Sequence, residues 1–521
     1  MMSSVVTGAS QSSFMIKKQS QTSKIGLALK NDEDGVLRIG RLAPDGLAMA
    51  NGLRVGDVVT EINGVPVTTT DRYTAAKMLR EAEGDLNITT AVSADDILTR
   101  TSFEAEDNLM DISERETFDV AHVHKFPLSF VLLSVQGFAA VFIYNLFDYG
   151  DVSNFATPKY IVFRDIMVML LLGFGYLMTF LESYGLGAVG LTMLLTAINM
   201  QCNFIFEGWL SGDMSISMDS IINAEFSAAA LLISFGALIG RVGPLEMCTV
   251  AIAESFFYAV NKVSIVFGLL KAEDVGGTIT IHMFGAYFGL ACAYALGPQE
   301  KESASKNATS RVSDVFSLLG TTLLWVYWPS FVGATETGVS MNEMHCTTNT
   351  IMSLVGSTSA TFLLSQYLNN GKFDAVHVQN STLAGGVAIG ATARLALGPS
   401  VAFLVGLVSG CVSVLGYYYS SPYLEVKFGI YDTCGVGNLH GYPSLIGGLL
   451  SILLVCIDSQ ADFLLYGVGT QSIVQFLAVL ATLAMAIVTG YLTGITFINK
   501  TTTGAAEIDD YEDAVYWVDV E

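Results

Sequence analysis

Twelve apolar stretches long enough to cross a membrane follow one another from residue 127 onward, and they constrain the fold more than any other feature. A helix needs about 20 mainly apolar residues to span the hydrocarbon core of a bilayer. Residues 127–521 carry only 41 charged side chains, whereas the much shorter stretch 1–126 carries 32, a density typical of soluble domains. We therefore expect a small soluble domain followed by an all-α polytopic membrane domain, with spans near 127–148, 161–181, 188–210, 222–241, 245–269, 274–296, 313–334, 347–368, 374–397, 399–419, 437–457 and 471–498.

The charge balance and the cysteines exclude several classes of function. The net charge of −23 argues against nucleic acid or anionic lipid as a main partner. The seven cysteines are far apart in the sequence and form no CxxC motif, so we expect no zinc site, no other metal and no disulfide framework. The sequence contains no GxxxxGK[ST] phosphate-binding loop. We expect a protein that is not an enzyme and that uses no cofactor.

The two chain ends are expected to lie on the same side of the membrane. The first 15 residues are polar and lack the basic and apolar regions of a signal peptide, and twelve is an even number of spans. Lysines and arginines are somewhat more frequent in the loops that this topology places inside the cell. The sequence thus predicts a multi-pass protein, in the plasma membrane, with cytoplasmic termini.

The N-terminal region contains short alternating β-type runs and one helix-like stretch, residues 71–81. The phrases IGLAL (25–29), RLAPDGLAMANGLRVGDVVTEINGVPV (41–67) and TAAKMLREAEGDLNITT (74–90) resemble a PDZ domain. Such domains bind the C-terminal peptide of another protein as an added strand. The resemblance matches Ile25, Gly26 and Leu27 to the carboxylate-binding loop and Arg72 to the start of the groove helix, which leaves the ligand class open. A PDZ-shaped domain without a peptide ligand remains the alternative.

These patterns divide the chain into five parts. We expect a disordered N-terminus (1–13), the PDZ domain (14–94), an acidic linker (95–126), the membrane domain (127–498) and a cytoplasmic C-terminal tail (499–521). The linker carries nine acidic residues and few apolar ones, which is typical of a solvated segment.

An internal repeat indicates where a functional site inside the membrane domain would lie. Asp274 stands eight residues before His282, and Asp432 stands eight residues before His440. Each pair falls in the last of five consecutive spans, and duplication of a five-span unit turns the second copy upside-down in the membrane. Eight helical residues rise about 12 Å, so each aspartate can cap its helix while its histidine lies near mid-bilayer. We expect a 5+5 inverted repeat whose two imidazoles meet between the halves.

Two central imidazoles favour a small neutral solute. A neutral imidazole offers one donor and one acceptor, which suffices to hold a small polar molecule. Carrying an intact cation through a dry bore costs tens of kcal/mol in the Born limit. Removing a proton from an amine-like cation with a pKa two to three units above neutral costs only about 3–4 kcal/mol. Ammonium that crosses as ammonia fits this arithmetic.

Around these residues the sequence resembles the Rh glycoprotein branch of the ammonium transporter superfamily. The resemblance covers about 160–521 and is carried by GFGYLMTFLESYG (173–185), INAEF (222–226), GGTITIHMFGAYFGL (276–290), LLWVYWPSF (323–331), VHVQNSTLAGGVAIG (376–390), DTCGVGNLHGYP (432–443) and YEDAVYW (511–517). It implies a homotrimer with one pore in each subunit and passive conduction of ammonia, with carbon dioxide or methylamine as further candidate solutes.

The resemblance also assigns roles to single residues. His282 and His440 match the twin histidines of the pore, and Phe226 and Phe331 match the outer gate. Asp274 matches the structural acid near the recruitment site, and Asp432 is its counterpart in the repeat. His377 and Asn380 are expected at the inner vestibule, with a metal-ligand role for His377 as the less favoured reading.

Other features depart from the family or leave its function open. Residues 245–273 contain no tryptophan for a cation–π cage, which favours weak recruitment of the cation. Glu254 lies mid-span without an evident partner, and His345 is expected in a solvated outer loop. The alternative function is a non-conducting ammonium sensor, or a scaffold that organises partners through the PDZ domain.

Overall fold

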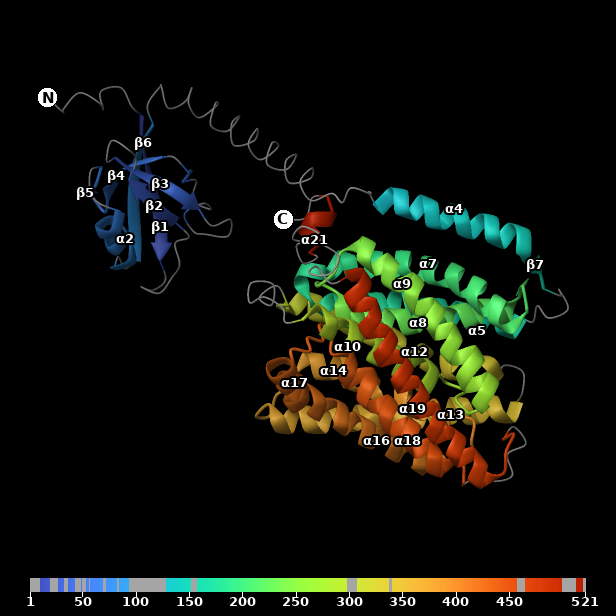
Figure 1. Ribbon diagram of the computed structural model, residues 1–521. Coiled ribbons are helices and arrows are strands. Elements are labelled where there is room, and N and C mark those ends of the chain that lie inside the picture. The colour runs from blue at the N-terminus through green and yellow to red at the C-terminus, as the bar shows by residue number, and fades with distance from the viewer. Residues whose placement is uncertain are drawn as a thin grey trace. The chain divides into compact units, whose positions relative to one another are not determined.

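The computed structural model describes residues 10–18, 27–31, 36–42, 48, 53–55, 57–68, 72–81, 84–92, 128–150, 157–297, 307–336, 340–456, 464–498 and 512–518. The chain divides into two compact units, Met1–Val123 and His124–Glu521 (Figure 1). The first holds the six-stranded sheet and the second holds the long helices.

The N-terminal unit is an antiparallel sheet with a helix. Its strands pair in the order β1-β6-β4-β3-β2, and β5 extends β4 at the hairpin. Buried apolar side chains of β1, β3, β4, β6 and α2 form one core, among them Ile16, Ile39, Ile62, Ala75 and Ile88. The elements are β1 (Ser10–Lys18), β2 (Leu27–Asn31), β3 (Leu37–Leu42), β4 (Val58–Ile62), β5 (Val65–Pro66), α2 (Arg72–Glu81) and β6 (Gly84–Val92).

The second unit is a bundle of helices, many of which contain π-helical or 3₁₀ turns. The elements up to the first histidine are α4 (Leu128–Leu146), α5 (Thr157–Val168), η2 (Met169–Phe174), α6 (Gly175–Leu177), η3 (Met178–Phe180), η4 (Glu182–Tyr184), α7 (Gly185–Ser211), α8 (Met218–Leu238), α9 (Pro244–Ala259), η5 (Val260–Leu270) and η6 (Thr278–Met283). The two-residue strands β7 (Asp148–Tyr149) and β8 (Ser215–Ile216) pair beside them.

The rest of the bundle consists of α10 (Phe284–Leu296), α12 (Arg311–Val332), η7 (Ala334–Glu336), α13 (Ser340–Leu368), α14 (Ala375–Ser381), α15 (Ala384–Ile389), α16 (Pro399–Leu415), η8 (Gly416–Ser420), α17 (Ser421–Phe428), η9 (Gly437–Gly441), α18 (Tyr442–Leu454), α19 (Val468–Thr493) and η10 (Gly494–Ile498). A last short helix is α21 (Asp513–Tyr516). Among the closest neighbours, α13 packs along α16, and α10 packs against α8 and α19.

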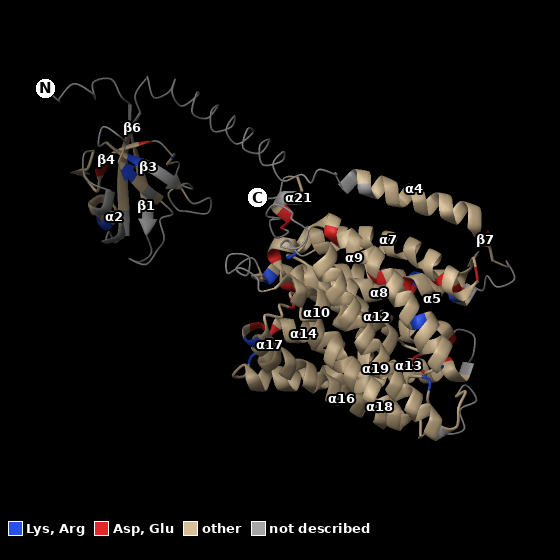
Figure 2. Ribbon diagram, viewed as in Figure 1, with Lys and Arg blue, Asp and Glu red and all other residues tan. Residues whose placement is uncertain are grey.

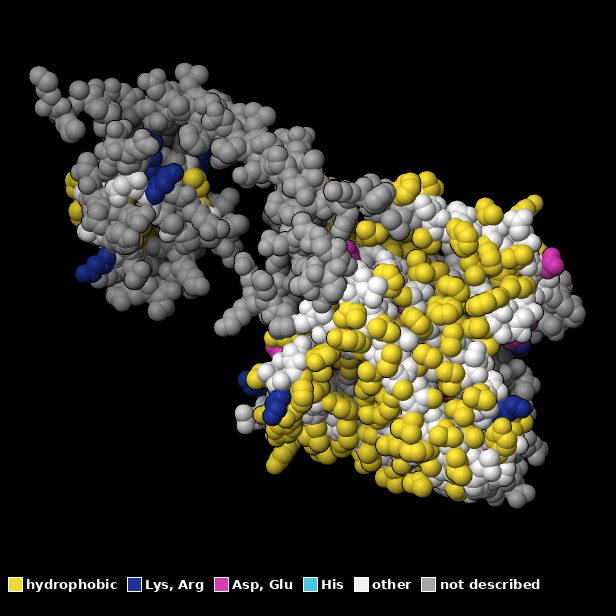
Figure 3. All heavy atoms as spheres, in the orientation of Figure 1, with side chains coloured by type: hydrophobic (Ala, Val, Ile, Leu, Met, Phe, Trp, Pro, Cys, Tyr) yellow, Lys and Arg dark blue, Asp and Glu magenta, His cyan; other side chains and the backbone are white. Residues whose placement is uncertain are grey.

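The bundle has the composition of a membrane domain. Eight of its helical stretches within the described residues are long and apolar enough to cross a bilayer. Figure 2 shows few charged residues along the helices, and Figure 3 shows apolar side chains spread over the visible face of the bundle. The helices therefore form a multi-pass membrane protein.

Two expectations for this unit were wrong. The ninth span, expected as one helix over 374–397, is broken into α14 and α15. A Cβ on Gly385 or on Gly390 would lie within 3 Å of neighbouring backbone atoms, so only glycine permits this close packing. Glycine also destabilises an α-helix, which explains why the helix is interrupted here. His345 belongs to α13, which begins earlier than expected, and its Nδ1 lies 3.2 Å from the Arg394 carbonyl oxygen.

The C-terminal segment is bound to the bundle. The Asp513 carboxylate accepts hydrogen bonds from the backbone N–H groups of Leu186 (2.6 Å) and Gly187 (2.7 Å) at the start of α7. A carboxylate is favourable there because the first N–H groups of a helix lack helical partners and carry partial positive charge. The Trp517 indole lies against Gly190, where no side chain intervenes.

Candidate functional site: a pore between two helical repeats

Asp274 fixes the start of the helix that carries His282. Its carboxylate oxygens accept hydrogen bonds from the N–H groups of Ile279 (3.0 and 3.1 Å) and Thr280 (2.7 Å), and from the Thr280 hydroxyl (2.8 Å). Gly277 precedes η6 with a φ of 69°, a conformation that favours glycine. Asp274 is 3% exposed, so it is a buried helix cap.

Asp432 does the same for His440. It accepts from the N–H groups of Val436 (2.9 Å) and Gly437 (2.8 Å), and Gly435 has a φ of 75° just before η9. The two halves of the repeat therefore use the same local device to begin the helix that holds each imidazole.

The two capped segments also dock in a reciprocal manner. Gly276, beside the first aspartate, donates its N–H to the Gly390 carbonyl at 2.9 Å, at the end of the broken span. Cys434, beside the second aspartate, donates its N–H to the Gly236 carbonyl at 3.0 Å, near the end of α8. Each segment thus binds the third helical span of the opposite half, as a two-fold related pair would.

His282 and His440 meet inside the bundle. Their Nδ1 atoms are 3.2 Å apart, the ring centroids are 5.2 Å apart, and the ring planes differ by 14°. The rings are 0% and 2% exposed, and the Nε2 atom of His282 has no hydrogen-bond partner among the described residues. One Nδ1 must donate to the other, so the pair offers a lone pair on one Nε2 and an N–H on the other.

Aromatic rings continue the line on both sides of the histidines. Phe226 contacts Phe331 edge-on at 5.1 Å, and Phe331 lies 5.9 Å from the His282 ring. On the far side Phe174 stacks on His440 at 6.0 Å. Neighbouring rings thus form a line that we call the ring file, in the order Phe226, Phe331, His282, His440 and Phe174.

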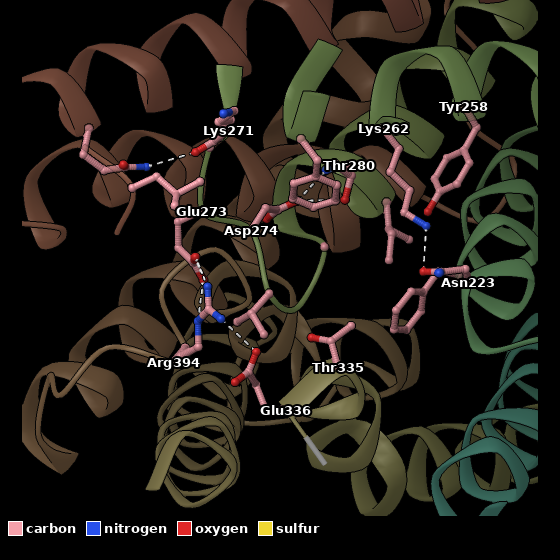
Figure 4. A pocket seen from close by; sticks show the side chains of 18 residues that line it. Asn223, Tyr258, Lys262, Lys271, Glu273, Asp274, Thr280, Thr335, Glu336 and Arg394 are labelled. Atoms are coloured by element: carbon pink, nitrogen blue, oxygen red, sulfur yellow. Dashed lines mark hydrogen bonds and ion pairs between the residues drawn. The ribbon is translucent and has the colours of Figure 1, made fainter. Parts of the chain in front are cut away.

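A cavity of about 320 Å³ opens at the Phe226 end of the ring file, and we call it the Lys262 cavity (Figure 4). Its lining combines Phe226 with charged and polar side chains from several helices. These are Asn223, Phe226, Tyr258, Lys262, Lys271, Glu273, Asp274, Thr280, Thr335, Glu336 and Arg394, among others.

An ion-pair network closes one wall of the Lys262 cavity. The Arg394 guanidinium binds the Glu273 carboxylate with two nitrogens and reaches Glu336 at 2.8 Å. Burial raises the pKa of the Glu273 carboxyl to about 7, and Arg394 opposes that rise. Gln475 donates to the Glu273 carbonyl at 2.8 Å, so the segment before η6 is also tied to α19.

A much smaller cavity, about 20 Å³, lies at the His440 end. Its lining includes Phe174, Asn380, Cys434 and His440. The space is enough for one molecule of the size of water. Asn380 thus lines the same small space as His440.

His377 lies close to this end but does not line either of the two cavities. Its Nδ1 is 3.2 Å from the Ser365 hydroxyl, and its ring centroid is 6.0 Å from that of Tyr417. Asp374 accepts from the N–H groups of Val376 and His377, so it caps α14. These contacts give His377 the environment of a packed, hydrogen-bonded side chain.

The PDZ residues are only partly described. Leu27 begins β2 and Arg72 begins α2, whereas Ile25 and Gly26 lie outside the described residues.

The sequence reasoning missed several side chains of the site. Trp328 stacks beside His282 at 5.6 Å, and Lys262 and Arg394 line the Lys262 cavity. A lysine in the middle of an apolar span was the available signal for Lys262, because such a charge needs a buried partner. Glu254 has a partner after all, since the Ser234 hydroxyl donates to its Oε1 at 2.8 Å.

Comparison with known proteins decides the family. The family model described as "Ammonium Transporter Family" matches residues 126–512. The chain belongs to the ammonium transporter family. A second model, the PDZ domain, matches residues 13–91.

Within the ammonium transporter family the chain belongs to the Rh branch. The mouse protein "Ammonium transporter Rh type B" is 37% identical over 389 residues, which cover 71% of this chain and 85% of that protein. Its human counterpart is 38% identical over 392 residues, covering 71% of this chain and 84% of that protein. The Rh50 structure of Nitrosomonas europaea is 32% identical, covers 70% of this chain and 92% of its own, and superposes with a TM-score of 0.60.

The same fold occurs in solved structures with lower sequence identity. Mep2 of Saccharomyces cerevisiae is 15% identical with a TM-score of 0.55, over 72% of this chain and 94% of its own. The family consists of transporters, not enzymes, and the expectation of an Rh-type membrane domain joined to a PDZ domain is confirmed.

Proposed function

We propose that this protein conducts ammonia through the ring file and that its solute arrives as ammonium. The observation that carries the proposal is the buried pair of imidazoles, with Nδ1 atoms 3.2 Å apart, on a path gated by Phe226 and Phe331. The Rh-type relatives, which are named as ammonium transporters, support the choice of solute.

The neutral form of the solute fits the path better than the cation. The rings that line it are almost completely excluded from solvent, and an ion entering such surroundings loses its hydration. Loss of a proton at the entrance costs about 3–4 kcal/mol for a cation with a pKa two to three units above neutral. The Nε2 of His282, which has no partner within the described part of the chain, then provides a hydrogen-bond partner for the neutral molecule.

We assign an outer and an inner end to the proposed passage, and we propose that transport along it is passive. We place the Lys262 cavity at the outer face, where ammonium loses its proton, and the small cavity beside His440 at the inner side, where ammonia regains one. With an even number of spans, both chain ends are then cytoplasmic. Net flux follows the concentration gradients of ammonium and of protons.

The remaining parts of the proposal concern assembly and location. We propose a homotrimer in the plasma membrane with one pore in each subunit, as the resemblance to Rh proteins implies. The PDZ domain would tether the channel by binding the C-terminal peptide of a partner protein. Carbon dioxide and methylamine are the further solutes to be tested.

Stopped-flow measurements on proteoliposomes test the conduction. We expect an ammonia permeability well above that of empty vesicles, and a loss of roughly tenfold or more when His282→Leu and His440→Leu are combined, since two solute hydrogen bonds of about 1 kcal/mol each disappear. His345→Leu, which removes an imidazole outside the ring file, is the matched control. Unchanged permeability in the double variant would refute the role of the histidines. A wild-type protein no more permeable than lipid would favour the sensor or scaffold.

A further inference from the structure

Lys262 places a buried positive charge at the mouth of the ring file. It belongs to η5, its side chain is 9% exposed, and it lines the same cavity as Phe226. A lysine amine is seldom buried to this extent unless other groups compensate its charge. The groups around the amine therefore indicate what kind of cation this part of the cavity can bind.

The surroundings of the Lys262 amine have the chemistry of an ammonium-binding site. Nζ donates to Asn223 Oδ1 at 2.8 Å and to Glu207 Oε1 at 2.8 Å. It also lies 5.8 Å from the centroid of the Tyr258 ring. Oxygen acceptors together with an aromatic face are the groups that bind an alkylammonium or ammonium ion.

A second observation shows that this site has further hydrogen-bonding capacity. The Tyr258 side chain is 0% exposed, and its hydroxyl has no partner among the described residues. Figure 4 shows Tyr258 and Asn223 on the two sides of the Lys262 amine at the cavity wall. Asn223 stands three residues before Phe226 on α8, so the site and the gate share one helix.

The carboxylates of the Lys262 cavity are already engaged by the chain itself. Glu273 and Glu336 bind Arg394, and Asp274 accepts from the N–H groups of Ile279 and Thr280. A dissolved ammonium ion would therefore have to compete for these carboxylates with Arg394 and with the backbone N–H groups that already bind them. The positive charge of Lys262 would also repel it.

We propose that the Lys262 amine is a tethered ammonium that permanently occupies the cation position of this vestibule. The inference deepens the proposed function and rests on it: Lys262 is the specificity-determining residue that keeps the vestibule from concentrating free ammonium. The protein therefore has a low apparent affinity for the ammonium that enters the vestibule and loses its proton there. Removal of Lys262 empties a ready-made site formed by Asn223, Glu207 and the Tyr258 ring.

Two measurements on the full-length protein test this inference. The first is thermal unfolding in detergent with increasing ammonium chloride, with sodium chloride at equal ionic strength as the reference. We expect ammonium-specific stabilisation in Lys262→Met and little in the wild type. The second is ammonium-dependent uptake in proteoliposomes, where the ammonium concentration at half-saturation should be at least about tenfold lower in Lys262→Met than in the wild type. Lys262→Arg should behave as the wild type.

Lys159→Met is the matched control. Lys159 also pairs with a carboxylate, Asp219 at 2.6 Å, at the start of the helix that carries Asn223, but it does not line the cavity. An equal shift in both methionine variants, or no ammonium-specific stabilisation in Lys262→Met, would overturn the inference. The unfolding assay does not depend on flux. A wild-type protein that fails to conduct while Lys262→Met still binds ammonium would therefore count against the proposed function and not against the site.

Discussion

Replacing Asp274 with alanine should abolish transport because it misplaces His282, whereas replacing it with asparagine should not. The Asp274 carboxylate accepts hydrogen bonds from two backbone N–H groups and one hydroxyl, all of them within Ile279 and Thr280. Alanine leaves three buried donors without a partner, and each costs about 1–3 kcal/mol. We therefore expect Asp274→Ala to lose about 3–9 kcal/mol in the turn that begins η6.

Asparagine can retain most of these bonds. The Oδ2 atom of Asp274 alone lies within 3.1 Å of the Ile279 N–H nitrogen, the Thr280 N–H nitrogen and the Thr280 hydroxyl. An amide oxygen at the same position keeps all three donors satisfied, and the loss should be about 1–2 kcal/mol. We expect Asp274→Asn to conduct ammonia within about threefold of the wild type.

The assay combines two readouts on the same purified proteins: the thermal unfolding midpoint in detergent, and ammonia permeability in proteoliposomes. Asp219→Ala and Asp219→Asn are the controls, because Asp219 is an exposed carboxylate whose partner is Lys159. Loss of permeability in Asp274→Asn with an unchanged unfolding midpoint would refute the positioning role. The charge of Asp274 would then act on the solute directly.

Two further predictions concern other parts of the structure. Burial raises the pKa of Glu273 from 4.5 to about 7, so the protonated carboxyl stabilises the fold fully below pH 4.5 and this contribution is lost as the pH rises through 7. The free energy of unfolding of the wild type should therefore fall by about 3 kcal/mol across that range, which a lower thermal unfolding midpoint would report. The unfolding midpoint of Glu273→Gln should not show this fall. Gly190→Leu should displace the Trp517 indole and release the C-terminal segment, which limited proteolysis would detect as faster cleavage. The control is Gly137→Leu, at a site with open space around it, where the cleavage rate should not change. Equal cleavage of the two variants would contradict the contact between Trp517 and Gly190.

The sequence alone predicts the parts of the site that repeat. The spacing from Asp274 to His282 recurs from Asp432 to His440, and a duplicated unit must bring its copies together about a common axis. The structure has the two imidazoles in contact and both aspartates at helix starts. Local hydropathy likewise predicts most of the spans, because a long run of apolar residues can be recognised from the consecutive residues themselves.

The parts that the sequence could not supply depend on contacts between distant residues. Lys262 binds residues 39 and 55 positions earlier in the chain, and Arg394 binds a glutamate 121 positions earlier. No periodic pattern encodes such partners. The break in the ninth span was missed for a similar reason, since its glycines are required by the helices packed against them and not by the local sequence.

Both histidines lie in π-helical turns, η6 and η9, and this places a limit on chain length around the pore. A π-helical turn holds one residue more than the α-helical turn that it replaces. Deleting a single residue from either turn would restore an ordinary helix and rotate one ring about 100° relative to the residues beyond it. The channel should therefore tolerate substitutions near its centre better than insertions or deletions. Relatives with functional pores should keep the same number of residues in both turns even where the residue types differ.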